Sequence, residues 1–112
     1  MEVKDALAAL AGLAQETRLA VFRLLVERGP EGMPAGAIAE ALGLANATLS
    51  FHLKELTHAD LLSVRQAGRF IYYRANYRTM NALVAYLTEN CCRGNTCDIA
   101  CAPGPEPRRK AS

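Results

Sequence analysis

The chain has 112 residues, of which 51% are hydrophobic and none is tryptophan, and its formal net charge is +2 at pH 7. This length allows one compact domain and excludes two ordinary ones. A core without tryptophan leaves so small a domain marginally stable alone, so we expect a second copy as partner. No apolar stretch suits a membrane span or a signal peptide, which predicts a cytoplasmic protein with reduced thiols.

Positive charge gathers in the middle of the chain. Residues 1–45 carry four basic and six acidic side chains, whereas residues 46–78 carry five basic and two acidic ones. A locally basic region suits a polyanion such as a nucleic acid, although an ordinary solvated surface also explains the imbalance.

Apolar residues recur at helical spacing in the first part of the chain. The segments "DALAALAGLA" and "TRLAVFRLLVE" both show this period and predict two amphipathic helices. The second helix should end near Gly29 and Pro30, because neither residue continues a helix well.

Two further helices should follow, joined by a short turn. In "PAGAIAEALG", Pro34 suits the first turn of a helix and Gly43 suits the position just past its end. Asn46 is placed to cap the next helix, "ATLSFHLKELTHA". An apolar stripe at i, i+4 and i+7 turns this helix toward a core; it consists of Leu49, Leu53 and Leu56.

The period then changes from helical to alternating. "LLSVRQ" and "RFIYYRA" flank Ala67-Gly68 and predict a β-hairpin with Arg65 and Arg69 beside its tip. Asn76 can cap a last helix, which is again amphipathic. The Pro-rich and charged end of the chain is expected to be disordered.

This order of elements is typical of a winged helix-turn-helix, in which the second helix of the motif enters the major groove of DNA. If the leucines face the core, the polar side chains of that helix face solvent or DNA. The candidates for DNA contact are Thr48, Ser50, Phe51 and Lys54, together with His52, for which packing against a neighbouring helix is the alternative. No set of residues forms a catalytic constellation, so we expect a protein that is not an enzyme.

Three segments carry a family resemblance over residues of about 14–87: "ETRLAVFRLL", "IAEALGLANATLSFHLKEL" and "LLSVRQAGRFIYYRA". They resemble the ArsR/SmtB family of bacterial metalloregulatory repressors, and the Ser-x-His-Leu-x-x-Leu run is the most specific piece. The resemblance implies a homodimer, joined through its first and last helices, that holds operator DNA until an inducer releases it. It also implies that Asn46, Thr48, Ser50 and His52 lie on the recognition helix and that Arg65 and Arg69 lie in the wing.

The chain departs from the family at its usual sensor sites. Arsenic sensors of the family carry a Cys-x-Cys pair at the start of a helix where this chain has Pro34 and Gly36. Zinc sensors use His on the last helix, and no His lies between Asn76 and Asn90. A milder departure is Asp60, which stands where the family often has Gly and which tolerates a left-handed conformation better than most residues.

All four cysteines lie instead in "NCCRGNTCDIAC", after the last predicted helix. Here the chain resembles arsenite-responsive family members that bind the metalloid through an adjacent cysteine pair plus one more. Soft thiolates select thiophilic ions, and the pair can serve together only if its backbone is not regular helix. Cys91 and Cys92 would be joined by Cys97, because turn-forming residues precede it, and Cys101 is the alternative third ligand.

The expected protein is therefore mainly α-helical with a β-hairpin wing, in three parts. Residues 1–90 form a winged helix-turn-helix domain for DNA binding and dimerisation, residues 91–101 a metalloid-binding segment, and residues 102–112 a disordered tail. The expected function is a repressor with no permanent cofactor, released by As(III) or Sb(III). A structural zinc site and a thiol redox switch are the open alternatives for the cysteines.

Overall fold

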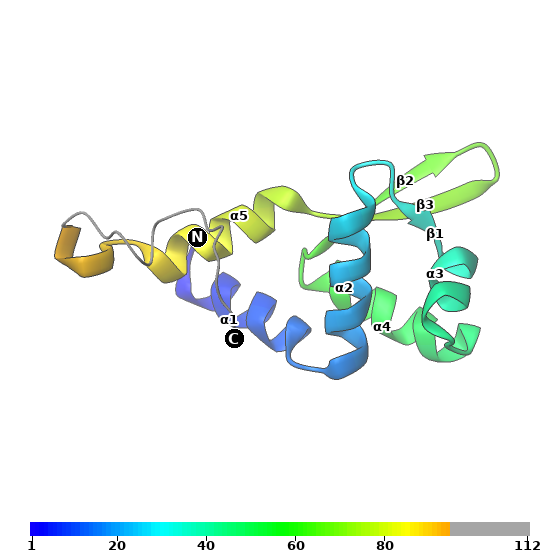
Figure 1. Cartoon of the computed structure of the whole chain (residues 1–112), viewed down its shortest axis with the longest axis horizontal. Helices are drawn as coiled ribbons and strands as arrows, with labels where there is room; N and C mark the ends of the chain where they lie inside the picture. Colours follow the sequence, from blue (N-terminus) through cyan, green and yellow to red (C-terminus); the bar gives the residue numbers. More distant parts are fainter. Residues whose placement is uncertain (95–112) are drawn as a thin grey trace, which may run out of the picture.

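The computed structural model describes residues 1–94. In this part of the chain, five α-helices and a three-stranded antiparallel sheet follow the order α1, α2, β1, α3, α4, β2, β3, α5 (Figure 1). The bounds are Val3–Leu13 (α1), Glu16–Arg28 (α2), Met33–Pro34 (β1), Ala35–Leu42 (α3), Asn46–His58 (α4), Leu62–Ala67 (β2), Phe70–Ala75 (β3) and Tyr77–Thr88 (α5). A single 3₁₀ turn, Cys91–Gly94, follows α5. The mainly helical fold with a hairpin wing is confirmed, and the predicted disordered tail lies outside the described residues.

Two helix ends follow from the capping residues that the sequence predicted. Gly43 ends α3 in the left-handed conformation, with φ of 65°, as glycine at this position commonly does. The side chain of Asn76 caps α5 by accepting a hydrogen bond from the backbone N–H of Thr79 at 3.3 Å. Both predictions are confirmed.

Two predicted helix starts are wrong by one residue. Pro34 is the N-cap of α3 rather than part of its first turn, because it belongs to β1 and pairs with Tyr72 of β3. Asn46 is the first residue of α4, and the N-cap is Ala45, which makes no side-chain capping bond.

The wing is a tight hairpin extended by a third, very short strand. β2 and β3 pair from Leu62 and Ala75 at the base to Ala67 and Phe70 at the tip, so the two turn residues are Gly68 and Arg69. Gly68 has φ of 63°, which a type II′ turn requires of its first central residue. β1 lies on the other side of β3, and its proline is tolerated because it forms a sheet edge.

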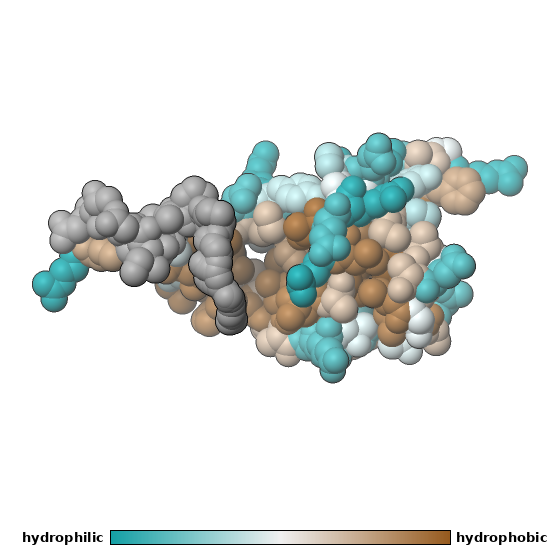
Figure 2. Space-filling model, viewed as in Figure 1, coloured by the Kyte–Doolittle hydropathy of each residue, from teal (hydrophilic) through white to brown (hydrophobic). Residues whose placement is uncertain are grey.

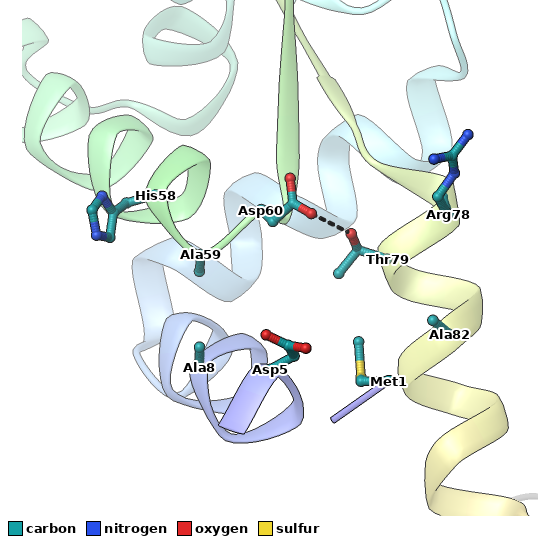
Figure 3. Close-up of a pocket in the computed structure, with 9 residues that line it drawn as sticks. All are labelled: Met1, Asp5, Ala8, His58, Ala59, Asp60, Arg78, Thr79 and Ala82. Atoms are coloured by element: carbon teal, nitrogen blue, oxygen red, sulfur yellow. Dashed lines mark hydrogen bonds between the residues drawn. The ribbon is translucent and has the colours of Figure 1, made fainter. Parts of the chain in front are cut away.

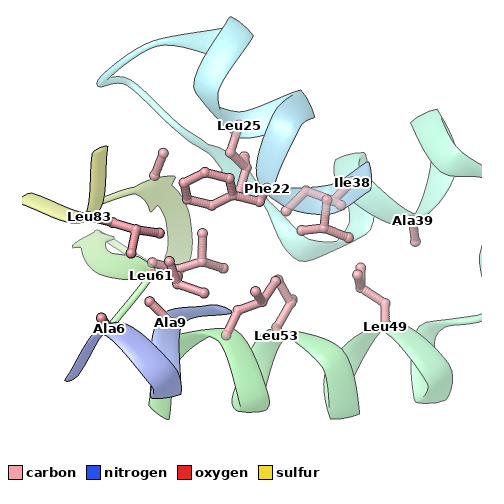
Figure 4. Close-up of a cluster of buried hydrophobic side chains, with 14 residues drawn as sticks. Ala6, Ala9, Phe22, Leu25, Ile38, Ala39, Leu49, Leu53, Leu61 and Leu83 are labelled. Atoms are coloured by element: carbon pink, nitrogen blue, oxygen red, sulfur yellow. The ribbon is translucent and has the colours of Figure 1, made fainter. Parts of the chain in front are cut away.

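The core is built almost entirely from aliphatic side chains. The predicted stripe of α4 is buried, with Leu49, Leu53 and Leu56 each at most 3% exposed. In Figure 4, Leu53 points toward Phe22 of α2, which is the one aromatic member of the buried hydrophobic set within residues 1–94. α4 is therefore held with its leucine face inward and the opposite face outward.

Large apolar side chains remain exposed at the end of the molecule formed by α1 and α5. These helices contact each other, and apolar surface extends over the α1 side of the molecule (Figure 2). The exposed residues are Met1 just before α1, Val3, Leu7 and Leu10 of α1, and Val84 and Leu87 of α5, at 40% to 60% exposure. None of the helices described is long and apolar enough to cross a membrane.

The loop before β1 approaches β3 closely at Gly32, whose φ is +78°. A Cβ atom there would lie 2.5 Å from the carbonyl oxygen of Tyr73. We predict that Gly32→Ala destabilises the fold by about 2 kcal/mol or more and lowers the melting temperature by about 8 °C or more. Gly36→Ala is the matched control, because no atom lies within 4 Å of its built Cβ and alanine is the better helix former. Equal melting temperatures for the two variants would contradict the close approach.

Candidate nucleic-acid interface and cysteine site

The outward face of α4 carries most of the predicted DNA contacts. Asn46, Thr48, Ser50, Phe51 and Lys54 are all exposed. Because the leucine stripe turns the opposite side of the helix into the core, these side chains stand on the surface that a groove of DNA can meet. They are placed as the prediction requires, and their contacts with DNA stay a prediction.

His52 is the exception, because it is buried. Its side chain is 9% exposed, and its Nδ1 atom is buried without a hydrogen-bond partner in the described part of the chain. The imidazole lies edge-on to the ring of Phe51, with the ring centroids 5.6 Å apart. The side chain of His52 therefore does not face outward as predicted, and the alternative, packing against a neighbouring helix, agrees with its burial.

An open trough separates α4 from the wing. Its volume is about 640 Å³, and Ser50, Lys54 and Thr57 line it from α4 while Val64 and Tyr73 line it from the sheet. Hydroxyl groups and one ammonium group thus face a channel whose other wall is the wing. Such groups contact phosphate oxygens in protein–DNA complexes, so the trough suits the sugar–phosphate backbone between two grooves.

The two wing arginines have different surroundings. Arg69 is exposed in the hairpin turn. Arg65 lies further down β2, where its guanidinium group donates a hydrogen bond to the carbonyl oxygen of Glu31 at 2.9 Å and lies 4.6 Å from the ring centroid of Tyr72. Both lie in the wing as predicted, but only Arg69 is at the tip. Neither Glu31, which holds Arg65 against the loop before β1, nor Tyr72, which pairs with it across the hairpin, was among the predicted site residues.

The cysteine segment begins directly after α5, in a backbone that is not regular helix. α5 ends at Thr88, and Asn90, Cys92 and Arg93 all have positive φ, between 57° and 59°. The Sγ atoms of Cys91 and Cys92 lie 3.5 Å apart. The condition set by the sequence analysis, that this pair lies outside regular helix, is therefore met.

The other two candidate ligands, Cys97 and Cys101, lie outside the described residues. Within residues 1–94, no three His, Cys, Asp or Glu side chains are grouped so that they could hold a metal ion. The third ligand of the proposed site therefore stays a prediction.

The end of α4 is joined to the start of α5 by a small hydrogen-bond network. Asp60, with φ of 64°, follows α4, and its Oδ2 accepts a hydrogen bond from the hydroxyl of Thr79 at 3.2 Å (Figure 3). The amide of Asn76 donates to the carbonyl oxygen of Asp60 at 3.0 Å. The network borders a cavity of about 290 Å³ between α1, α4 and α5. Helix α4 and the helix before the cysteines are thus joined at Asp60.

Helix α3, a short turn, an outward-facing α4 and a β-hairpin wing define a winged helix-turn-helix, a class of DNA-binding regulators. A family profile described as a helix-turn-helix domain matches residues 13–65. The transcriptional repressor SdpR of Bacillus subtilis (strain 168) is 36% identical over 64 residues, which are 57% of this chain and 68% of SdpR.

The nodulation protein NolR of Rhizobium meliloti is 31% identical over 80 residues, which are 71% of this chain. That match spans 63% of NolR, less than two thirds of its length. An ArsR-like transcriptional regulator from Rhodococcus sp. RHA1 shares the fold with a TM-score of 0.71 at 24% identity, over 80% of this chain and 82% of that one. The chain belongs to the ArsR family of winged helix-turn-helix transcriptional regulators, and its relatives are DNA-binding regulators rather than enzymes.

The contacts of Arg65 predict a structural role that Arg69 does not share. Replacing Arg65 with Gln removes one hydrogen bond and one cation–π contact, each exposed and each contributing about 0.5–1 kcal/mol. We expect Arg65→Gln to speed amide hydrogen exchange in β3 and to lower the melting temperature by a few degrees. Arg69→Gln removes the same charge at the exposed turn and should change neither. Equal effects of the two variants would contradict the anchoring role.

Proposed function

We propose that this protein is a cytoplasmic repressor that binds operator DNA as a homodimer and leaves it when trivalent arsenic or antimony binds its cysteines. The ligands are Cys91 and Cys92 with Cys97, or with Cys101 as the alternative third. The proposal goes beyond the family assignment in naming the inducer, the dimer and the operator. One observation carries it: the 3.5 Å separation of two adjacent sulfurs directly after α5.

This separation suits two thiolates that share one ion. At a bond length of about 2.3 Å, as zinc makes to thiolate, two sulfurs at the tetrahedral angle lie about 3.8 Å apart. The narrower angles of a pyramidal centre bring the sulfurs closer than that, toward the 3.5 Å between Cys91 and Cys92. Thiolates also select thiophilic ions over the hard cations that prefer oxygen.

The exposed apolar side chains of α1 and α5 support a homodimer. A contiguous apolar surface is unusual on a small monomer and marks an interaction site, and Leu7 and Leu87 are both about 60% exposed here. A homodimeric winged helix-turn-helix domain from Mycobacterium bovis, described as a possible ArsR-family regulator, is 26% identical over 83% of this chain and 86% of its own, with a TM-score of 0.63. A second copy of this chain is the occupant that covers the surface.

A structural relative also supports the inducer class. A protein described as a possible transcriptional regulator for arsenical resistance is 30% identical over 70% of this chain and 79% of its own, with a TM-score of 0.59. The family's Cys-x-Cys site is missing here at Pro34 and Gly36. The segment after α5 is the alternative place for a thiolate site.

The hydrogen bonds of Asp60 could couple inducer binding after α5 to DNA binding at α4. Ordering the segment after α5 acts on that helix, whose first turn holds Asp60 through Asn76 and Thr79. Asp60 lies two residues beyond the end of α4, so a change in the angle of α5 reaches the recognition helix directly. Linkage requires that DNA weaken metalloid binding by the same factor by which the metalloid weakens DNA binding.

DNA binding is tested by fluorescence anisotropy with the promoter region upstream of the gene at two salt concentrations. We expect specific binding that weakens steeply as salt rises. Lys54→Gln should reduce the slope of log K against log salt by about 2 for a homodimer, one phosphate contact for each subunit. Lys4→Gln, on α1, makes the same charge change away from the interface and should leave the slope unchanged. Failure to bind DNA at either salt concentration would rule out the repressor.

Inducer binding is tested by adding arsenite to the protein–DNA complex. We expect arsenite to weaken DNA binding by about 5- to 150-fold, and we expect Cys91→Ser and Cys92→Ser each to abolish that response because a pyramidal site needs three sulfurs. Each variant is compared with its own arsenite-free state. Cys97→Ser and Cys101→Ser identify the third ligand, since only one of them should abolish the response.

Adding zinc or peroxide in place of arsenite distinguishes the other two roles of the cysteines, a structural zinc site and a thiol redox switch. Release by peroxide and not by arsenite would assign a redox switch, and zinc binding that leaves DNA affinity unchanged would assign a structural site. A normal arsenite response in either Cys91→Ser or Cys92→Ser would overturn the proposed inducer site.

A further inference from the structure

The most outward surface of α4 is apolar over one helical turn. Phe51 is 58% exposed, and Ala47, one turn earlier on the same side, is exposed as well. Residues four apart on a helix lie one above the other, so the two side chains form a continuous strip. The strip lies opposite Leu49 and Leu56, which are buried in the core.

The ring of Phe51 packs against the ring of a buried neighbour on the same helix. The ring of His52 is buried and lies edge-on to it, with an angle of 66° between the ring planes. An aromatic side chain has only two rotatable χ angles, so it loses little entropy when it is immobilised against a partner. Phe51 therefore projects from α4 as an apolar group that loses little conformational entropy when a partner covers it.

The surroundings of the strip are polar and carry both signs of charge. Lys54 and Glu55 are both exposed one turn after Phe51, and Ser50 and Thr57 line the trough beside it. Because residues 46–78 carry five basic and two acidic side chains, this part of the chain still favours a polyanion over an apolar protein surface. The partner that fits is one with a negative backbone and with small apolar groups inside a groove.

Double-stranded DNA has such groups at one kind of base. In the major groove each base pair presents hydrogen-bond donors and acceptors, and thymine alone adds an apolar group, its C5-methyl. A phenyl ring and a methyl side chain cannot pair with donors or acceptors, but both can bury a methyl group. The chemistry of Phe51 and Ala47 thus matches thymine and none of the other three bases.

We propose that Phe51, with Ala47 beside it, contacts thymine C5-methyl groups in the major groove and so gives the operator a preference for thymine at one or two positions in each half-site. The inference rests on the proposed function, because it requires that α4 enter the major groove. It assigns phosphate contact to Ser50 and Lys54 at the trough, and sequence preference to the apolar strip.

The test uses the full chain and the tightest duplex that it selects from a randomised DNA pool. Single thymines within the protected half-sites are replaced by deoxyuridine, which keeps the Watson–Crick pairing and lacks only the methyl group. At one or two positions in each half-site we expect an affinity loss of about fourfold for each methyl group, the factor for one buried group of this size. In Phe51→Ala the penalty should disappear at the position that Phe51 contacts, and only a penalty at a position that Ala47 contacts should remain.

Phe70→Ala is the matched control, because Phe70 is 61% exposed in the wing and lies outside α4. It should retain the full deoxyuridine penalty. A change in DNA stiffness on removing the methyl group would penalise Phe51→Ala as much as the wild type, so a variant that keeps the wild-type penalty at every position overturns the inference. So does a penalty lost in Phe70→Ala alone.

The outcomes also separate this inference from the proposed function. If the chain selects no duplex from the pool, the repressor itself is ruled out. If it selects a duplex whose thymines can all be replaced without loss, DNA binding stands and the role of Phe51 is overturned. In that case a changed association state of Phe51→Ala in sedimentation would assign the strip to a protein partner.

Discussion

Burial of one side of α4 is the constraint on which the rest of the molecule depends. A helix presents a residue every 100° or so, so once Leu49, Leu53 and Leu56 are in the core the direction of every other side chain on α4 is set. Phe51 and Lys54 face outward for this reason, and His52, beside the leucines, is drawn inward. The core gains from aliphatic burial at about 25 cal/mol per Å², and the same packing orients the surface that we propose for DNA binding.

Local patterns predicted the parts of the fold that depend on local physics. Helical spacing, the glycine at position 43 and the cap at Asn76 each act within a few residues, and each was confirmed. The strand β1 was missed because two residues, Met33 and Pro34, are too short to show a period and pair with residues far along the chain. The same pairing explains why Pro34 precedes α3 as its N-cap instead of lying in its first turn.

The candidate site divides in the same way. Exposure of Ser50 and Lys54 follows from the helical period alone, whereas the burial of His52 depends on how α4 packs against its neighbours. The contact of Arg65 with Tyr72 could have been predicted from the sequence, because a turn at Gly68 and Arg69 pairs these two residues directly across the hairpin. The hydrogen bond from Arg65 to Glu31 could not have been predicted, since it joins residues 34 positions apart.

Asp60 meets two requirements at once, a left-handed backbone and a carboxylate that accepts a hydrogen bond. Glycine would adopt its φ of 64° with less strain, but glycine has no carboxylate to accept the hydroxyl of Thr79. With aspartate, the residue that turns the chain away from the recognition helix is also the residue that grips the first turn of α5. The domain therefore ties the end of α4 directly to the start of the helix that precedes the cysteines, at the cost of a small local strain.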